Sequence, residues 1–208
     1  MKALGVIILA AGASTRMGQP KLLLPWRGST VIGQLISQWR SLGVGQIAVV
    51  LRPNDTALHA ELDRLDFPMH DRIVNPHPEH GMFSSIVCAA RWPGWRGDIL
   101  RWAVVLGDQP HLKTETLHRL LTFSALNLDA VCQPAFKGRA AHPVVLPQPV
   151  FAGLQTSSAH TLKEFLKLAR CRHVKHLIND PGLSLDLDTP EDYIKAKGLI
   201  KSHEKTGA

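Results

Sequence analysis

Short apolar runs alternate with longer amphipathic stretches over the first part of the chain. Continuous runs rich in valine, isoleucine and leucine predict buried strands at residues 4–9, 46–51, 72–74 and 102–106. Apolar residues at helical spacing predict helices at residues 30–42, 56–65, 82–91 and 115–124. This alternation of strand and helix is typical of a parallel sheet that carries helices on both faces.

The remainder of the chain is less regular. Strands are predicted at residues 130–133 and 143–146 around a turn at 137–139, followed by a helix at 161–169 and a strand at 174–177. A last helix is predicted to begin at Pro190, because Glu191 and Asp192 occupy its first turn. No repeat or linker divides the chain, so we predict one domain over residues 1–200 and a polar C-terminal tail over residues 201–208.

Composition excludes several classes of protein. No apolar run approaches the roughly 18 residues of a membrane span, and the apolar N-terminus leads directly into a small-residue loop, which predicts a buried strand and not a targeting segment. The three widely spaced cysteines indicate a reducing cytoplasm, with no disulfide framework or zinc spacing. The net charge of +7 suits either solubility or an anionic ligand. Because no basic stripe or cluster of stacking aromatics accompanies this charge, neither nucleic acid nor a membrane is an expected partner.

The segment after the first predicted strand has the composition of a phosphate-binding loop. Small residues let backbone amides approach phosphate oxygens, and two cations add positive charge. The candidate nucleotide-binding residues here are Leu9, Ala10, Ala11, Gly12, Arg16 and Lys21. An ordinary small-residue turn is the alternative interpretation. The spacing of the glycines and of the lysine fits neither a dinucleotide-binding fingerprint nor a Walker loop.

Two acidic motifs supply candidate metal ligands. Asp108 follows a predicted strand, where a carboxylate can hold a catalytic magnesium against phosphates. Alternation along an extended segment puts Asp186 and Asp188 on one face, where the two carboxylates repel each other unless a cation joins them. Helix capping is the alternative for each motif. We predict that these three residues bind metal, and that Asp108, Arg16 and Lys21 are the catalytic residues.

A proline-rich loop carries weaker signals. Gly81 precedes a predicted helix whose free N-terminal amides, together with Asn75 and Ser85, can meet a base or a ribose. Capping by a serine is the alternative. His77 and His80 lie three residues apart in the same loop, which we interpret as lacking cysteine or acidic companions at ligand spacing. The sequence therefore does not favour a metal site at these histidines.

Four segments together resemble the MobA-like NTP transferase family, and within it the molybdenum cofactor cytidylyltransferases. They are LAAGASTRMGQPKLLLPWRG at residues 9–28, NPHPEHGMFSSI at 75–86, GDQP at 107–110 and DLDTPEDY at 186–193. Their order and spacing extend the resemblance over nearly the whole chain. The resemblance implies an α/β chain with a Rossmann-like, three-layer nucleotidyltransferase fold and a mostly parallel sheet.

The resemblance also implies roles for the candidate residues. The loop that contains Arg16 and Lys21 would bind the triphosphate, and Asp108 would coordinate magnesium with Asp186 or Asp188 as a second ligand. Residues 81–85 would meet the nucleotide.

On the acceptor side, members of the family carry a G-x-x-G-H-P pattern, which here spans residues 138–143 with Ala141 in place of the second glycine. We predict His142 as an acceptor-binding residue, although a lone histidine is more often structural.

The reaction implied by the resemblance is transfer of CMP from CTP to the terminal phosphate of molybdenum-loaded molybdopterin, with Mg²⁺ as cofactor and pyrophosphate as product. A phosphate monoester is largely anionic at neutral pH, because its second pKa is about 6, so no general base is needed. Guanylyl-transferring relatives begin this loop with Leu-Ala-Gly-Gly, and the methyl group of Ala11 therefore predicts CTP over GTP.

Other functions stay open at this point. The alternatives are a guanylyltransferase, an NTP transferase for another phosphorylated acceptor, and a non-catalytic cofactor carrier or nucleotide sensor. A molybdoenzyme or its chaperone is a further expected partner.

Overall fold

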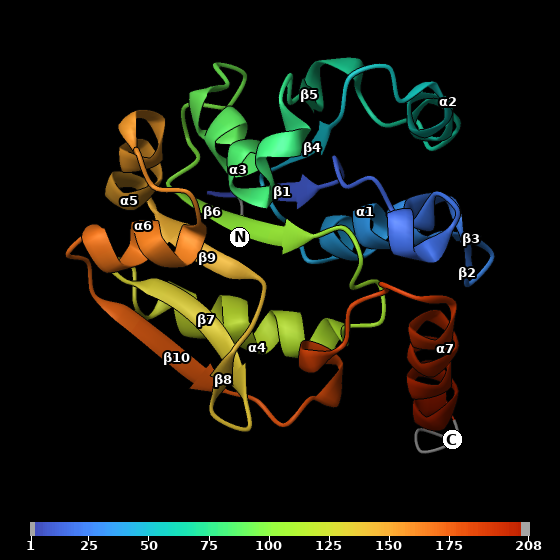
Figure 1. The fold of residues 1–208 in the computed structure, drawn as a ribbon. Helices are drawn as coiled ribbons and strands as arrows, with labels where there is room; N and C mark the ends of the chain where they lie inside the picture. The colour runs from blue at the N-terminus through green and yellow to red at the C-terminus, as the bar shows by residue number, and fades with distance from the viewer. Residues whose placement is uncertain (1–2, 205–208) are drawn as a thin grey trace.

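An eight-stranded sheet crosses the centre of the protein in the computed structural model, which describes residues 3–204 (Figure 1). Seven strands follow the spatial order β10-β7-β9-β6-β1-β4-β5, and β8 pairs with β7. The strands of this sheet are β1 (Leu4–Leu9), β4 (Gln46–Leu51), β5 (Arg72–Val74), β6 (Arg101–Leu106), β7 (Val131–Phe136), β8 (Arg139–Ala140), β9 (Val144–Pro147) and β10 (His173–Leu177).

The four strands from the first part of the chain are parallel. Leu9 at the end of β1 lies opposite Val50 of β4 and Leu106 of β6, so these strands finish at the same edge of the sheet. In open α/β sheets, ligands bind outside this carboxyl edge. The mostly parallel α/β fold predicted from the sequence is confirmed.

One strand runs against the others in the middle of the sheet. β9 pairs antiparallel with both β6 and β7. Only residues 137–143 separate β7 from β9, and a parallel connection needs a crossover of a dozen residues or more. The short connection therefore forces the antiparallel pairing.

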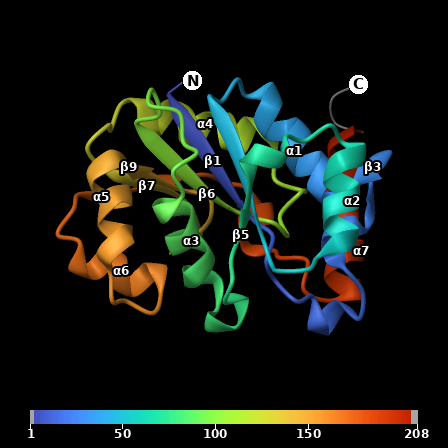
Figure 2. The same cartoon turned by 90° about the horizontal axis from the view of Figure 1, so that it is seen from above.

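Helices cover both faces of the sheet and complete a three-layer arrangement (Figures 1 and 2). Helices α3, α5 and α6 lie on one face, and α1 and α4 on the other. The helices are α1 (Val31–Ser41), α2 (Thr56–Arg64), α3 (Met82–Arg91), α4 (Thr114–Ala125), α5 (Gln148–Gly153), α6 (Leu162–Leu168) and α7 (Pro190–Glu204).

The core divides between the two faces according to strand alternation. In β1, Val6 and Ile8 join the cluster that contains Trp39 of α1, whereas Ile7 joins the cluster that contains Phe83 of α3. Side chains of a strand alternate between the two faces of a sheet. A continuous apolar run, such as Leu4–Leu9 of β1, therefore fills both layers of core.

Most predicted elements agree with the structure to within a few residues. The sequence missed the hairpin of β2 (Pro25–Trp26) and β3 (Ser29–Thr30), whose two-residue turn places Arg27 and Gly28 at positive φ. It also missed α5. Helix α7 continues to Glu204, into the predicted polar tail, and the rest of that tail, residues 205–208, lies outside the described residues. None of the described helices is both long and apolar enough to cross a membrane.

Candidate active site

The loop that follows β1, residues 10–24, lies at the carboxyl edge of the sheet; we call it the first loop. The N–H of Ala10 donates to the carbonyl of Val50 at 2.8 Å, and the N–H of Gly107 donates to the carbonyl of Leu9 at 3.1 Å. A Cβ atom at Gly107 would lie 2.5 Å from the Leu9 carbonyl oxygen, so only glycine permits this approach. The start of the first loop and the end of β6 are thus held side by side.

A cavity of about 500 Å³ opens between the first loop, the end of β6 and the start of α3. This volume is within the range of small-molecule sites. Predicted site residues that line the cavity are Leu9, Ala10, Ala11, Gly12, Lys21, Gly81, Ser85 and Asp108. We call it the nucleotide cavity. The structure therefore brings together residues that are nearly 100 positions apart in the sequence.

Lys21 lies at the centre of the charged groups in this cavity. Its Nζ is 2.6 Å from Oδ2 of Asp108 and 3.4 Å from Oδ1 of Asp188. Arg16 pairs with the other oxygen of Asp188 at 3.0 Å. The side chain of Lys21 is 15% exposed, whereas that of Arg16 is 70% exposed. Lys21 therefore acts in a less hydrated environment, where a charge interacts more strongly with its neighbours.

The second acidic motif lies against Asp108. The N–H of Leu187 donates to the Asp108 carbonyl at 3.1 Å, and the side chain of Leu187 is fully buried. Oδ1 of Asp186 accepts a hydrogen bond from Nε2 of Gln109 at 2.9 Å. Partial burial of the Asp186 carboxylate, followed by the negative charges of Asp108 and Asp188, raises its pKa, although the residue as a whole is exposed. The structure thus gathers the three predicted carboxylates.

The three carboxylates fit an oxygen-preferring divalent cation. Oδ1 of Asp108 is buried and has no hydrogen-bond partner among the described residues. Burial, and after it the negative charges of Asp108 and Asp188, raise the pKa of Asp186, so its ionised form is disfavoured at this place. A cation such as Mg²⁺ or Mn²⁺, which binds carboxylate oxygens, would satisfy both groups.

A family match decides the class of this protein. Residues 6–177 match the family model for the MobA-like NTP transferase domain, which covers most of the chain. The chain is a MobA-like NTP transferase. It is therefore a nucleotidyltransferase, as the sequence predicted.

The chain is also similar to individual proteins over most of its length. The molybdenum cofactor cytidylyltransferase of Escherichia coli (strain K12) is 27% identical over 95% of this chain and 97% of its own. The nicotine blue oxidoreductase of Paenarthrobacter nicotinovorans is 31% identical over 75% of this chain and 74% of its own. Among solved structures, the manganese complex of Rv0371C from Mycobacterium tuberculosis H37Rv superposes with a TM-score of 0.69, at 28% identity, over 93% of this chain and 97% of its own.

In this MobA-like NTP transferase, Asn75 does not line the nucleotide cavity and instead lines a neighbouring cavity of about 570 Å³. It is buried, and its Nδ2 donates to the hydroxyl groups of Ser84 at 2.7 Å and Ser85 at 3.0 Å. Ser85 itself lines the nucleotide cavity. Asn75, predicted to bind nucleotide, is therefore placed to position the start of α3 and does not line the nucleotide cavity. Gly81, at φ +85°, lets the chain turn into that helix.

His142 lies near enough to Asp108 for the two charges to interact. Among the described residues, it does not belong to the lining of the nucleotide cavity. Its Nδ1 lies 3.3 Å from the carbonyl of Val104, and burial lowers its pKa. The neutral ring thus packs against β6, and its predicted contact with an acceptor stays a prediction.

Two residues of the site were missed by the sequence prediction. Arg52 lines the nucleotide cavity from the end of β4, and its Nε is 2.9 Å from Oδ2 of Asp55. Its place directly after a buried strand is the signal that could have indicated it. Gln109, next to Asp108, holds Asp186. No spacing rule joins Gln109 to a residue 77 positions later.

Proposed function

We propose that the protein transfers CMP from CTP to the terminal phosphate of molybdenum-loaded molybdopterin and releases pyrophosphate. The observation that carries this proposal is the pairing of Lys21 with Asp108 and Asp188 beside a cavity lined by the first loop. The name of the Escherichia coli relative supports the cytidylyl group and the acceptor.

The residues of the chain would act by binding and by neutralising charge. An oxygen of the acceptor phosphate attacks the α-phosphorus in line, and the bond to the bridging oxygen breaks with its electron pair, which leaves with pyrophosphate. Lys21 and Arg16 would meet the negative charge that grows on the departing group. Backbone amides of the first loop would position the phosphates. Because the attacking phosphate is already anionic, no side chain has to remove a proton.

We further propose Mg²⁺ as the cofactor. Asp108, Asp186 and Asp188 are the residues that would hold it, and the bound ion supplies charge neutralisation at phosphate oxygens. Oδ1 of Asp108, which has no hydrogen-bond partner in the part of the chain that the structure describes, supports this assignment, as does the manganese complex of the Mycobacterium tuberculosis protein.

The three cysteines, Cys88, Cys132 and Cys171, are all free, which supports the reducing cytoplasm as the compartment.

The decisive experiment incubates the protein with CTP, GTP or ATP, Mg²⁺ and molybdenum-loaded molybdopterin, followed by mass spectrometry of the product and assay of pyrophosphate. We expect a CMP adduct of the pterin and one pyrophosphate per adduct. A GMP adduct, or a product with another phosphorylated acceptor, would assign the protein to the alternative transferases.

The same experiment separates the transferase from other classes. Nucleotide binding without pyrophosphate release would indicate a cofactor carrier or a nucleotide sensor. The name of the Paenarthrobacter relative denotes an oxidoreductase, so absence of pyrophosphate together with oxidation or reduction of a small molecule would replace our proposal. The three clustered carboxylates beside Lys21 favour phosphate chemistry over that alternative.

A further inference from the structure

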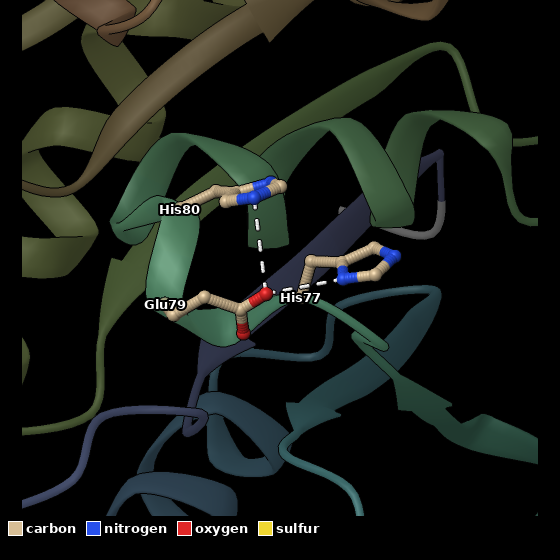
Figure 3. A group of neighbouring side chains, drawn as sticks. All are labelled: His77, Glu79 and His80. Carbon is tan, nitrogen blue, oxygen red and sulfur yellow. Dashed lines mark hydrogen bonds and ion pairs between the residues drawn. The ribbon is translucent and has the colours of Figure 1, made fainter.

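The loop between β5 and α3 carries a second group of ligating side chains, which the proposed function does not use. Nδ1 of His77 lies 3.1 Å from Oε1 of Glu79, and Nε2 of His80 lies 3.8 Å from the same oxygen. One ligating atom from each of the three side chains lies within 4.8 Å of the other two (Figure 3). Glu79 is thus the acidic companion that the sequence interpretation overlooked.

These separations suit a small metal ion. Two ligand atoms on a tetrahedral zinc ion, with bonds of about 2.0–2.1 Å, lie roughly 3.3 Å apart. The observed separations of 3.1 and 3.8 Å lie on either side of that value. The two imidazole rings stack at a centroid distance of 5.2 Å. Modest side-chain rotations would therefore bring all three ligands onto one ion.

The backbone of the loop is held in place by hydrogen bonds. The N–H of His77 donates to Oδ1 of Asn75 at 2.9 Å, and the hydroxyl of Ser84 donates to the carbonyl of His77 at 3.0 Å. A single 3₁₀ turn, Pro78–His80, then joins the ligands, with the N–H of His80 bonded to the carbonyl of His77. The three ligands are presented by a fixed turn, which lowers the entropy cost of gathering them.

We propose that His77, Glu79 and His80 bind a divalent transition-metal ion of the zinc type, at a site separate from the carboxylates around Asp108. Two imidazoles and one carboxylate suit Zn²⁺, Co²⁺, Ni²⁺ or Cu²⁺, whereas Mg²⁺ prefers oxygen ligands alone.

The site lies on the ridge between two cavities. Pro78 and Glu79 line the nucleotide cavity, whereas His77 and His80 line a neighbouring cavity of about 570 Å³. All three ligating side chains are exposed, so a bound ion keeps open coordination positions. Water or an anionic group of a molecule in either cavity can occupy these positions.

The test is a titration of the tag-free protein with Co²⁺, monitored by visible absorption, in millimolar Mg²⁺ that occupies the carboxylate site. We expect one Co²⁺ per chain, displaced by Zn²⁺. His77→Ala and His80→Ala should each weaken binding at least tenfold, and Glu79→Gln should weaken it as well. Circular dichroism checks that each variant is folded.

Two controls isolate the proposed ligands. His70→Ala removes another exposed histidine next to an acid, outside the group, and should keep the wild-type affinity. Asp108→Asn removes a carboxylate of the proposed magnesium site and should also keep the wild-type affinity for Co²⁺. Cobalt binding is therefore measured independently of the proposed function, and the result stands even if that function is wrong. Absence of cobalt binding would overturn the proposal. Wild-type affinity for Co²⁺ in the His77→Ala and His80→Ala variants would also overturn it. So would a sulfur-to-cobalt charge-transfer band, which would assign the ion to cysteine.

Discussion

At the scale of single residues, the two oxygens of the Asp108 carboxylate differ. Oδ2 accepts a hydrogen bond from Lys21, while the buried Oδ1 has no partner among the described residues. A buried polar atom without a partner costs free energy. A bound cation at Oδ1 would remove this cost. Asp108 is therefore the first residue to substitute in a test of the site.

We predict that Asp108→Asn abolishes turnover while the protein stays folded. Asparagine has nearly the same shape but no charge, so the variant loses a metal ligand and keeps its packing. The loss should reach at least about 3 kcal/mol of transition-state stabilisation, or roughly a hundredfold in rate. Pyrophosphate release at saturating Mg²⁺ measures the rate, and thermal unfolding checks the fold. Near-normal release would show that Asp108 holds no essential metal.

Lys21→Ala and Arg16→Ala should lower kcat more than they weaken binding of the nucleoside triphosphate. The charge that they meet grows as pyrophosphate departs, so their interaction is strongest in the transition state. The effect of Lys21 should be the larger, roughly 10²–10³-fold in kcat, because water screens the exposed Arg16. Steady-state kinetics with varied CTP separate kcat from KM. A raised KM at unchanged kcat for both variants would identify simple binding residues.

The methyl group of Ala11 should set the preference for CTP over GTP. Ala11 lines the nucleotide cavity and is almost fully buried, so a purine has less room beside it than a pyrimidine. One methyl contact discriminates by about 1–3 kcal/mol, which corresponds to a clear but incomplete preference. We expect Ala11→Gly to raise kcat/KM for GTP relative to CTP with the same acceptor. Equal use of both nucleotides by the wild type contradicts the cytidylyl assignment, whereas an unchanged ratio in the variant contradicts only the steric reason.

At the scale of elements, the sequence predicted what local patterns determine. The strands β1, β4 and β5 and the helix α3 match their predicted bounds, because each combines one clear period with a clear boundary. The β2–β3 hairpin was missed because its strands are too short to show alternation. The place of β9 between β6 and β7 depends on which strands become its neighbours, and no local pattern records this.

In the candidate site, too, local patterns predicted some residues, whereas the places of others depend on distant parts of the chain. The first loop and the Asp108 motif each lie directly after one strand, so the sequence could place both at the carboxyl edge. Gln109 reaches Asp186 only because the chain returns after α6 and β10. Asn75 was predicted to bind nucleotide; the structure shows its bond to Ser85 and its place in the lining of a neighbouring cavity, and its contact with a nucleotide stays a prediction.

At the scale of the whole molecule, the site combines residues from both ends of the chain, Lys21 from the first loop and Asp188 from the segment before α7. The segment before α7 is tied to the loop after β6 by the bond from Leu187 to Asp108 and by His111, whose Nε2 lies 3.1 Å from the carbonyl of Gly182. Nearby, the hydroxyl of Thr116 in α4 donates to Asp180 at 2.6 Å. Assembly of the carboxylates around Lys21 therefore requires the folded chain as a whole, and the stability of these contacts bears directly on the site.

We predict that acid lowers the free energy of unfolding of the protein because it protonates His111 in the unfolded chain. Burial lowers the pKa of His111, so the folded protein keeps its ring neutral, whereas the unfolded chain binds a proton below about pH 6.5. A group whose pKa is depressed on folding contributes stability above its unfolded pKa, and that contribution is lost as the pH falls through the folded pKa. The free energy of unfolding, measured by urea denaturation, should therefore fall from pH 7.5 to pH 5.5.

The variant His111→Gln isolates this contribution. Glutamine has no titrating ring, and its side-chain amide can donate to the Gly182 carbonyl in place of Nε2, so the tie to the segment before α7 is preserved. The variant should lose less stability than the wild type over the same pH interval, because the contribution of His111 is absent from it. His118→Gln, in α4, is the matched control and should follow the wild type, since it leaves His111 and its hydrogen bond in place. Parallel stability curves for wild type and His111→Gln would assign the acid sensitivity to another group.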